Sequence, residues 1–148
     1  MKILVDADAC PVKEIIVKVA KQFSLHVTML IDTSHEIHDG YSTVITVDKA
    51  RDSVDIALIN ITKFGDVVVT QDYGVAAMAL GKGAKAINQN GRIYNDDNID
   101  KLLFERHLGQ KVRRGGGRTK GFKKRTKEDD EQFENVFRRL VEESSSIF

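Results

Sequence analysis

Two aspartates close the first apolar segment of the chain, and their position points to chemistry. The chain begins Lys2-Ile-Leu-Val-Asp6-Ala-Asp8-Ala-Cys10-Pro11. Its apolar residues are typical of a strand buried on both faces, and proline fits the first turn of a helix. Asp6 and Asp8 then lie at the carboxyl end of a strand, the edge where open α/β sheets bind ligands such as metal ions and phosphate groups.

A structural explanation of the same pair is that Asp8 caps the following helix and Asp6 only ends the strand. This explanation accounts well for Asp8. Two acids separated by one small residue nevertheless repel each other unless a cation or a proton relieves them. We therefore expect Asp6 to be functional.

Two further acids are expected to join this pair. The segment Asp66-Val-Val-Val-Thr70 predicts another strand, and Asp72 follows its carboxyl end. Asp55 lies on the helix that leads into this strand. If the two strands are neighbours, Asp6, Asp8 and Asp72 converge at the point where the strand order reverses, and Asp55 completes the cluster.

A cluster of carboxylates with few histidines or cysteines favours hard cations. Such oxygen ligands suit Mg²⁺ or Mn²⁺ rather than zinc. These ions support phosphoryl chemistry, because they lower the pKa of bound water and stabilise a leaving oxygen. The alternative is a set of unrelated turn and cap aspartates, since aspartate is common at such positions.

The elements that must position these acids alternate between strand and helix. Hydrophobic periodicity predicts strands near residues 3–5, 25–31, 43–47, 66–70 and 84–87, with helices near 11–23, 50–64, 73–80, 97–110 and 128–143. This alternation predicts a three-layer α/β/α fold with a mostly parallel five-stranded sheet. Residues 1–110 would form the domain, and the amphipathic C-terminal helix within residues 128–148 would dock on it.

Composition restricts the class of protein. The chain has 148 residues, 41% hydrophobic and 30% charged, which is typical of one soluble domain. No apolar stretch approaches the thickness of a bilayer, and no signal peptide precedes the first strand. Its single cysteine cannot form an internal disulfide. We therefore expect a cytoplasmic protein with no membrane partner.

Basic charge is concentrated between residues 111 and 127. This segment contains nine basic residues, no acidic ones and three consecutive glycines, which predicts a mobile loop. We expect it to bind nucleic acid, with single-stranded RNA preferred, through the phosphate backbone. Alternatively, it is solvated or pairs with the acidic segment Glu128–Glu131. The residues predicted to bind nucleic acid are Arg113, Arg114, Arg118, Lys120, Lys123, Lys124 and Arg125.

Several motifs resemble one known family over nearly the whole chain. They are Val5-Asp6-Ala-Asp8-Ala-Cys10-Pro11-Val-Lys13, Thr70-Gln71-Asp72-Tyr73, Ala76-Ala-Met78-Ala-Leu80, Asn98-Ile99-Asp100 and Arg113-Arg114 followed by Arg118-Thr119-Lys120-Gly121. Together they resemble the YaiI/YqxD family of bacterial proteins.

This resemblance implies a fold and an acidic pattern like those of PIN-like nucleases. It implies that Asp6, Asp55 and Asp72 occupy the positions of the PIN-like acids. PIN-like sites often have another Asp or Asn after the next strand, and the residues near that position in this chain are Asn88 and Asn90.

The resulting hypothesis is a Mg²⁺- or Mn²⁺-dependent nuclease with RNA as its expected substrate. One alternative is a nucleic-acid-binding protein without catalysis. Another is an aspartyl-phosphate phosphohydrolase, because a strand ending in Asp-x-Asp resembles the haloacid-dehalogenase superfamily, with Asp6 as nucleophile and Asp8 as acid. The later motifs of that superfamily fit poorly, since Gly65-Asp66 precedes a strand instead of following one.

Two other residue types receive structural interpretations. Cys10 lies near the start of a helix, and the simplest role for it is a small, partly buried thiol. His35 and His38 flank Glu36-Ile37 in a polar segment, and we interpret both as surface residues.

Overall fold

The central feature of the fold is a six-stranded sheet with the order β3-β2-β1-β4-β5-β6. The computed structural model describes residues 1–48, 53–114 and 124–146, except for the side chains of Arg106 and residues 110–114. The strands are β1 (Ile3–Asp6), β2 (Val27–Asp32), β3 (Thr43–Val47), β4 (Val67–Val69), β5 (Lys85–Ile87) and β6 (Ile93–Tyr94). The first five are parallel, and β6 is antiparallel to β5.

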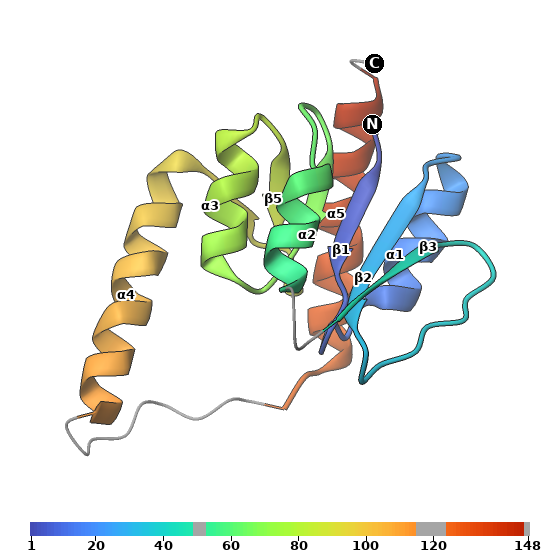
Figure 1. Cartoon of the computed structure of the whole chain (residues 1–148). Coiled ribbons are helices and arrows are strands. Elements are labelled where there is room, and N and C mark those ends of the chain that lie inside the picture. Colours follow the sequence, from blue (N-terminus) through green and yellow to red (C-terminus); the bar gives the residue numbers. More distant parts are fainter. Residues whose placement is uncertain (49–52, 115–123, 147–148) are drawn as a thin grey trace.

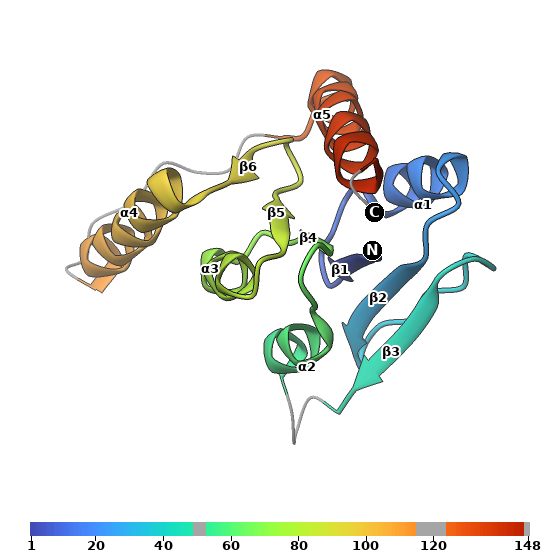
Figure 2. The same cartoon turned by 90° about the horizontal axis from the view of Figure 1, so that it is seen from above.

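Helices cover both faces of this sheet, as Figures 1 and 2 show. They are α1 (Lys13–Gln22), α2 (Val54–Ile61), α3 (Tyr73–Gly81), α4 (Asp96–Arg114) and α5 (Lys127–Ser145). Helices α1 and α5 lie on one face, and α2 and α3 on the other. Helix α4 packs against α3 beyond the β6 edge. Among the described residues, none of the helices combines the length and apolarity needed to cross a membrane.

The alternation of side chains along β1 explains the two hydrophobic cores. Ile3 and Val5 point into the core shared with α1 and α5, whereas Leu4 points into the core shared with α2 and α3. All three are completely buried. Phe133 and Phe137 of α5 are also completely buried, and their rings stack with centroids 5.1 Å apart. The C-terminal helix is therefore part of the same fold.

The predicted fold class, a mostly parallel α/β fold with a C-terminal helix, is confirmed. The sheet has one strand more than expected, because the two residues of β6 are too few for a periodicity to show. Helix α4 continues to Arg114, so residues 111–114 of the predicted loop are helical. Residues 115–123 of that loop lie outside the described part of the chain.

A buried ion pair ties the amino ends of the two central strands together. Asp66 is 3% exposed and accepts hydrogen bonds from the backbone N–H groups of Lys2 (3.1 Å) and Lys63 (2.8 Å). The Lys2 ammonium lies 2.6 Å from the second carboxylate oxygen. These contacts hold the start of β1 beside the start of β4, in the register that pairs Ile3 with Val67.

We predict that Asp66→Ala lowers the free energy of unfolding by about 2–4 kcal/mol, because it leaves two backbone donors and an ammonium group without their acceptor. Urea denaturation measures this change. Asp100→Ala is the matched control: Asp100 is exposed on α4, and its replacement should change stability by less than about 0.5 kcal/mol. Equal effects of the two substitutions would contradict the prediction.

Candidate active site

The site begins with the pairing of β1 and β4. Asp6 is the last residue of β1, and the register of the two parallel strands places it beside Thr70. The Thr70 hydroxyl donates a hydrogen bond to Asp6 Oδ2 at 3.0 Å. Strands β2 and β3 extend to one side of β1, and β4 and β5 to the other. The carboxyl ends of β1 and β4 therefore form the switch point of the sheet, where ligands bind in open α/β folds.

Thr70 connects Asp6 to Asp72, and the sequence analysis did not identify it. It is 1% exposed, and its hydroxyl oxygen accepts a hydrogen bond from the Asp72 N–H at 3.0 Å. Because the oxygen accepts from the backbone, its proton is directed to Asp6. The signal in the sequence is a hydroxyl residue at the end of β4, one position beyond the apolar run.

The other three predicted acids all act on the pKa of Asp6. Burial is the largest of several causes that together raise the pKa of the Asp6 carboxyl from 3.8 to about 6, and the hydrogen bond from Thr70 opposes this rise. The negative charges of Asp55, Asp72 and Asp8 contribute the rest of the rise to this value. Asp55 therefore lies within electrostatic range of Asp6, although it is on the separate helix α2. Asp6 is a half-buried acid surrounded by like charges.

Asp72 has a structural role as well. Its Oδ1 accepts hydrogen bonds from the N–H groups of Gly74 (2.8 Å) and Val75 (3.2 Å), and so caps α3. The cap fixes the orientation of the carboxylate. Together with Asp6, Asp8, Gln71 and Tyr73, it lines an open cavity of about 290 Å³. Asp72 is thus both a helix cap and a wall of the acidic cavity.

Asp8 does not cap α1. The residue at that cap is Val12, and no side chain accepts a hydrogen bond there. Instead, Asp8 Oδ1 lies 2.9 Å from His35 Nδ1. The turn after Asp8 places Ala9 at φ +59°, in the left-handed region that is unfavourable for a residue with a Cβ atom. Gln71 Nε2 donates to the Ala9 carbonyl at 3.1 Å and supports this turn.

Asp32 and His35 extend the acidic cluster, and the sequence analysis missed this role for both. Asp32 ends β2, and its Oδ1 lies 3.1 Å from His35 Nδ1. Hydrogen bonds from the hydroxyl and N–H of Ser34, and then from His35, lower the pKa of Asp32 to about 2. One ligand atom from each of Asp8, Asp32 and His35 lies within 4.8 Å of the others. His35 is partly exposed, as expected, but it pairs with two acids.

The two asparagines proposed near the fourth acidic position are engaged elsewhere. Asn88 Oδ1 accepts from the N–H groups of Asn90 and Arg92, and this closes the turn between β5 and β6. Asn90 Oδ1 accepts from Arg125 at 2.7 Å. Among the described residues, the acids that act on Asp6 are instead Asp8, Asp55 and Asp72.

Arg125 anchors the end of the basic segment to the fold. Its guanidinium also donates to Asp130 Oδ1 and to the Gln89 carbonyl, both at 2.6 Å. Lys124 beside it is exposed. Of the other predicted nucleic-acid contacts, the side chains of Arg113 and Arg114 and all of Arg118, Lys120 and Lys123 lie outside the described part of the chain. Nucleic-acid binding by this segment stays a prediction.

The residues present fit a divalent cation. A hard cation prefers carboxylate oxygens and offsets the repulsion between them. The raised pKa of Asp6 shows that this repulsion, added to burial, acts on a side chain that lines the cavity. Asp6, Asp8, Asp55 and Asp72 are the candidate ligands, with Asp32 and His35 beside them.

The fold and site define an α/β protein with an acidic cluster at the switch point of its sheet. The chain belongs to the family described as "Uncharacterized BCR, YaiI/YqxD family", whose model matches residues 4–143. The resemblance inferred from the sequence motifs is therefore confirmed.

The family includes curated relatives that align along almost their full length. A "UPF0178 protein" of Ruminiclostridium cellulolyticum is 69% identical over 98% of this chain and 95% of its own length. Another, from Alkaliphilus oremlandii, is 56% identical over 97% of this chain and 93% of its own length. The relative from Clostridium acetobutylicum is 56% identical over 95% of this chain and 97% of its own length. The search of solved structures found no significant match.

We predict that Asp6→Asn stabilises the metal-free protein at high pH but not at low pH. The folded protein holds the Asp6 proton more tightly than the unfolded chain does, since its pKa is about 6 instead of 3.8. Stability therefore falls as the pH rises from about 4 to about 6, and the amide removes this cost. Allowing for solvent screening, the variant should be more stable by about 1–2 kcal/mol at pH 8.

Urea denaturation in EDTA between pH 4 and pH 8 measures this difference. Asp100→Asn, on the exposed surface of α4, is the matched control and should show no such trend. A difference between Asp6→Asn and the unmodified protein that is the same at every pH would contradict the prediction.

We predict that Arg125→Ala destabilises the protein by about 1–2 kcal/mol, because it removes three charge-assisted hydrogen bonds at a partly exposed position. Lys124→Ala removes the same charge from an exposed neighbour and should leave stability within about 0.5 kcal/mol. Thermal denaturation of both variants tests this. If both melt at the same temperature, the anchoring role of Arg125 is wrong.

Proposed function

We propose that this protein is a divalent-metal-dependent nuclease that hydrolyses phosphodiester bonds, with single-stranded RNA as its preferred substrate. One observation carries the proposal: the half-buried Asp6 carboxylate, at the switch point of the sheet, lies in the combined field of Asp8, Asp55 and Asp72. Such a cluster costs stability unless a cation compensates it. Its position and donor type suit Mg²⁺ or Mn²⁺.

The candidate ligands come from separate elements of the fold: Asp6 and Asp8 from the end of β1, Asp72 from the end of β4, and Asp55 from α2. When bound, a divalent cation lowers the pKa of a water ligand and stabilises the leaving oxygen of a phosphodiester. Thr70 orients Asp6, and the helix cap orients Asp72. These contacts preorganise the carboxylates before substrate arrives.

The charge state of Asp6 makes the proposed activity dependent on pH. Its carboxyl has a pKa of about 6 without metal, and it must lose its proton to act as a ligand. Activity should therefore rise between about pH 5 and pH 7. The cavity that Asp6 shares with Gln71, Asp72 and Tyr73 is open, so both water and a single strand of nucleic acid can reach it.

Charge near the site supports a nucleic-acid substrate. Helix α4 ends and α5 begins on the side of the molecule where the parallel strands have their carboxyl ends, as Figure 1 shows. The end of α4 and the start of α5, which belong to the basic segment, therefore lie on the side of the acidic cluster. The Arg125 charge acts on the thiol of Cys10, which also experiences the charge of Asp6. Basic residues beside a catalytic cluster suit a phosphate backbone.

We predict that the purified protein cleaves labelled single-stranded RNA with Mg²⁺ or Mn²⁺ and that EDTA abolishes cleavage. Asp6→Asn and Asp72→Asn should each reduce the rate by at least about 100-fold while the protein stays folded. Asp100→Asn is the control for charge removed elsewhere and should retain full activity. Gel analysis of labelled RNA, DNA and duplex substrates measures these rates.

Two results would contradict the proposal and favour one of its alternatives. Binding of RNA without cleavage under any metal condition would favour a nucleic-acid-binding protein. Hydrolysis of p-nitrophenyl phosphate but not of RNA would favour the phosphohydrolase, with Asp6 as nucleophile. Cleavage that persists in Asp6→Asn would show that the activity comes from another protein.

A further inference from the structure

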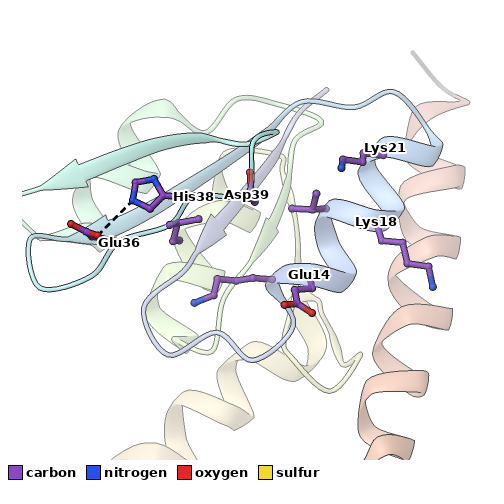
Figure 3. A pocket seen from close by; sticks show the side chains of 9 residues that line it. Glu14, Lys18, Lys21, Glu36, His38 and Asp39 are labelled. Carbon is purple, nitrogen blue, oxygen red and sulfur yellow. Dashed lines mark ion pairs between the residues drawn. The ribbon is translucent and has the colours of Figure 1, made fainter.

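A second cavity lies beside the acidic cluster. It has a volume of about 380 Å³ and lies between α1 and residues 36–39 of the segment 33–42 that joins β2 to β3. Figure 3 shows the side chains that line it: Glu14, Lys18 and Lys21 project from α1, and Glu36, His38 and Asp39 from the opposite segment. The volume falls within the range of small-molecule binding sites.

The cavity has an apolar floor. Val17 of α1 is 8% exposed and belongs to the hydrophobic core under the sheet. Ile37, from the opposite wall, packs against the same core and is only partly covered. A flat apolar group placed here would bury the remaining surface of both side chains. Because Val17 and Ile37 pack against the close-packed core, moving them away from such a group would cost free energy.

The polar rim offers both hydrogen-bond donors and acceptors. Lys21 lies with its ammonium 5.5 Å from the centre of the Tyr41 ring. Asp39 is held by the N–H groups of Tyr41 (2.8 Å) and Ser42 (2.7 Å), which accounts for its fixed position. Lys18 differs, because its ammonium extends toward α5 and pairs with Glu134 at 3.1 Å. Lys21 and Asp39 therefore present opposite charges at the rim, and the ammonium of Lys18 is already paired.

Both walls of the cavity lead to the acidic cluster. On one wall, the Lys13 ammonium donates to the carbonyl oxygen of Ala7, the residue between Asp6 and Asp8, at 3.5 Å. On the other, His35 belongs to the segment that carries Ile37, and it pairs with Asp8. The acidic cluster and the cavity are therefore connected through Lys13 on one wall and through the segment that carries His35 and Ile37 on the other.

We infer that this cavity binds the base of the nucleotide adjacent to the scissile phosphate of a single-stranded nucleic acid. This inference rests on the proposed nuclease function. The base lies on Val17 and Ile37, and the ammonium groups of Lys13 and Lys21 hold the neighbouring phosphates. The rim carboxylates accept hydrogen bonds from the amino groups of a base. A base in a duplex is stacked and paired, so only an unpaired strand can place one here.

Nucleotide binding in EDTA tests the inference without any cleavage. Isothermal titration of the full chain with adenosine, guanosine, cytidine and uridine 5′-monophosphates should give saturable binding. Ribose 5-phosphate and inorganic phosphate, which lack the base, should bind at least about fivefold more weakly, given the usual contribution of base contacts. Binding of ribose 5-phosphate as tight as that of the nucleotides would overturn the inference.

Matched variants locate the binding. Ile37→Ala should weaken nucleotide binding about fivefold or more, whereas Ile93→Ala, at an exposed isoleucine on β6, should leave it unchanged. Lys21→Gln should weaken it, and Lys18→Gln should not, since the Lys18 ammonium is paired with Glu134. Equal effects within either pair, or no binding at millimolar nucleotide, would overturn the inference.

The two proposals can fail separately. RNA cleavage that depends on Asp6, combined with no nucleotide binding in EDTA, would keep the nuclease and overturn the cavity assignment. Nucleotide binding that depends on Ile37 and Lys21, combined with no cleavage of RNA under any metal condition, would overturn the nuclease and leave the cavity as a nucleotide-binding site without a scissile phosphate.

Discussion

Strand β1 lies in the middle of the sheet, between parallel strands on both sides, and this position determines where the acidic side chains fall. β2 and β4 run in the same direction as β1, so the residues that follow all three strands share one edge. Asp6, Asp32 and Asp72 reach that edge from three strands, and Asp8 follows from the turn after β1. Complete burial of Ile3, Leu4 and Val5 prevents the strand from shifting to relieve their repulsion.

The aspartates at the two ends of the central strands have different surroundings. One is satisfied by donors within the fold, and the other lies among like charges. At the amino end, Asp66 is buried, but two backbone donors and the Lys2 ammonium satisfy it. At the carboxyl end, Asp6 has the Thr70 hydroxyl as its hydrogen-bond donor, and the negative charges of Asp55, Asp72 and Asp8 raise its pKa. The first arrangement stabilises the fold. The second costs stability that a bound cation would restore.

The acidic site could be predicted from the sequence to the extent that it depends on strand ends. Apolar runs in the sequence predicted β1 and β4. Asp6, Asp8 and Asp72 could then be identified as the acids at the carboxyl ends of these strands. Asp32 also follows an apolar run that predicts a strand, but its role was missed because the polar segment after it gave no sign that it turns back toward Asp8. The contact between His35 and Asp8 joins residues far apart in the sequence, and no local pattern indicates it.

The basic segment shows a second limit of sequence patterns. Charge density identified residues 111–127, but it could not distinguish a residue that faces solvent from one that is engaged in the fold. Arg125 contacts Asn90, Gln89 and Asp130, which come from two different parts of the chain. Similarly, α4 continues through Gly109 into the segment, because the residues after this glycine include good helix formers and the run of three glycines begins only at Gly115.

We propose that the aspartates at the carboxyl edge of the sheet form one cation site around Asp6. Carbon-13 NMR of the Asp6 carboxyl group, titrated with acid in EDTA and again in saturating Mg²⁺, tests it most directly. The account predicts a pKa of about 6 without metal and a clearly lower pKa with Mg²⁺. A pKa near 3.8 in EDTA that Mg²⁺ leaves unchanged would contradict it.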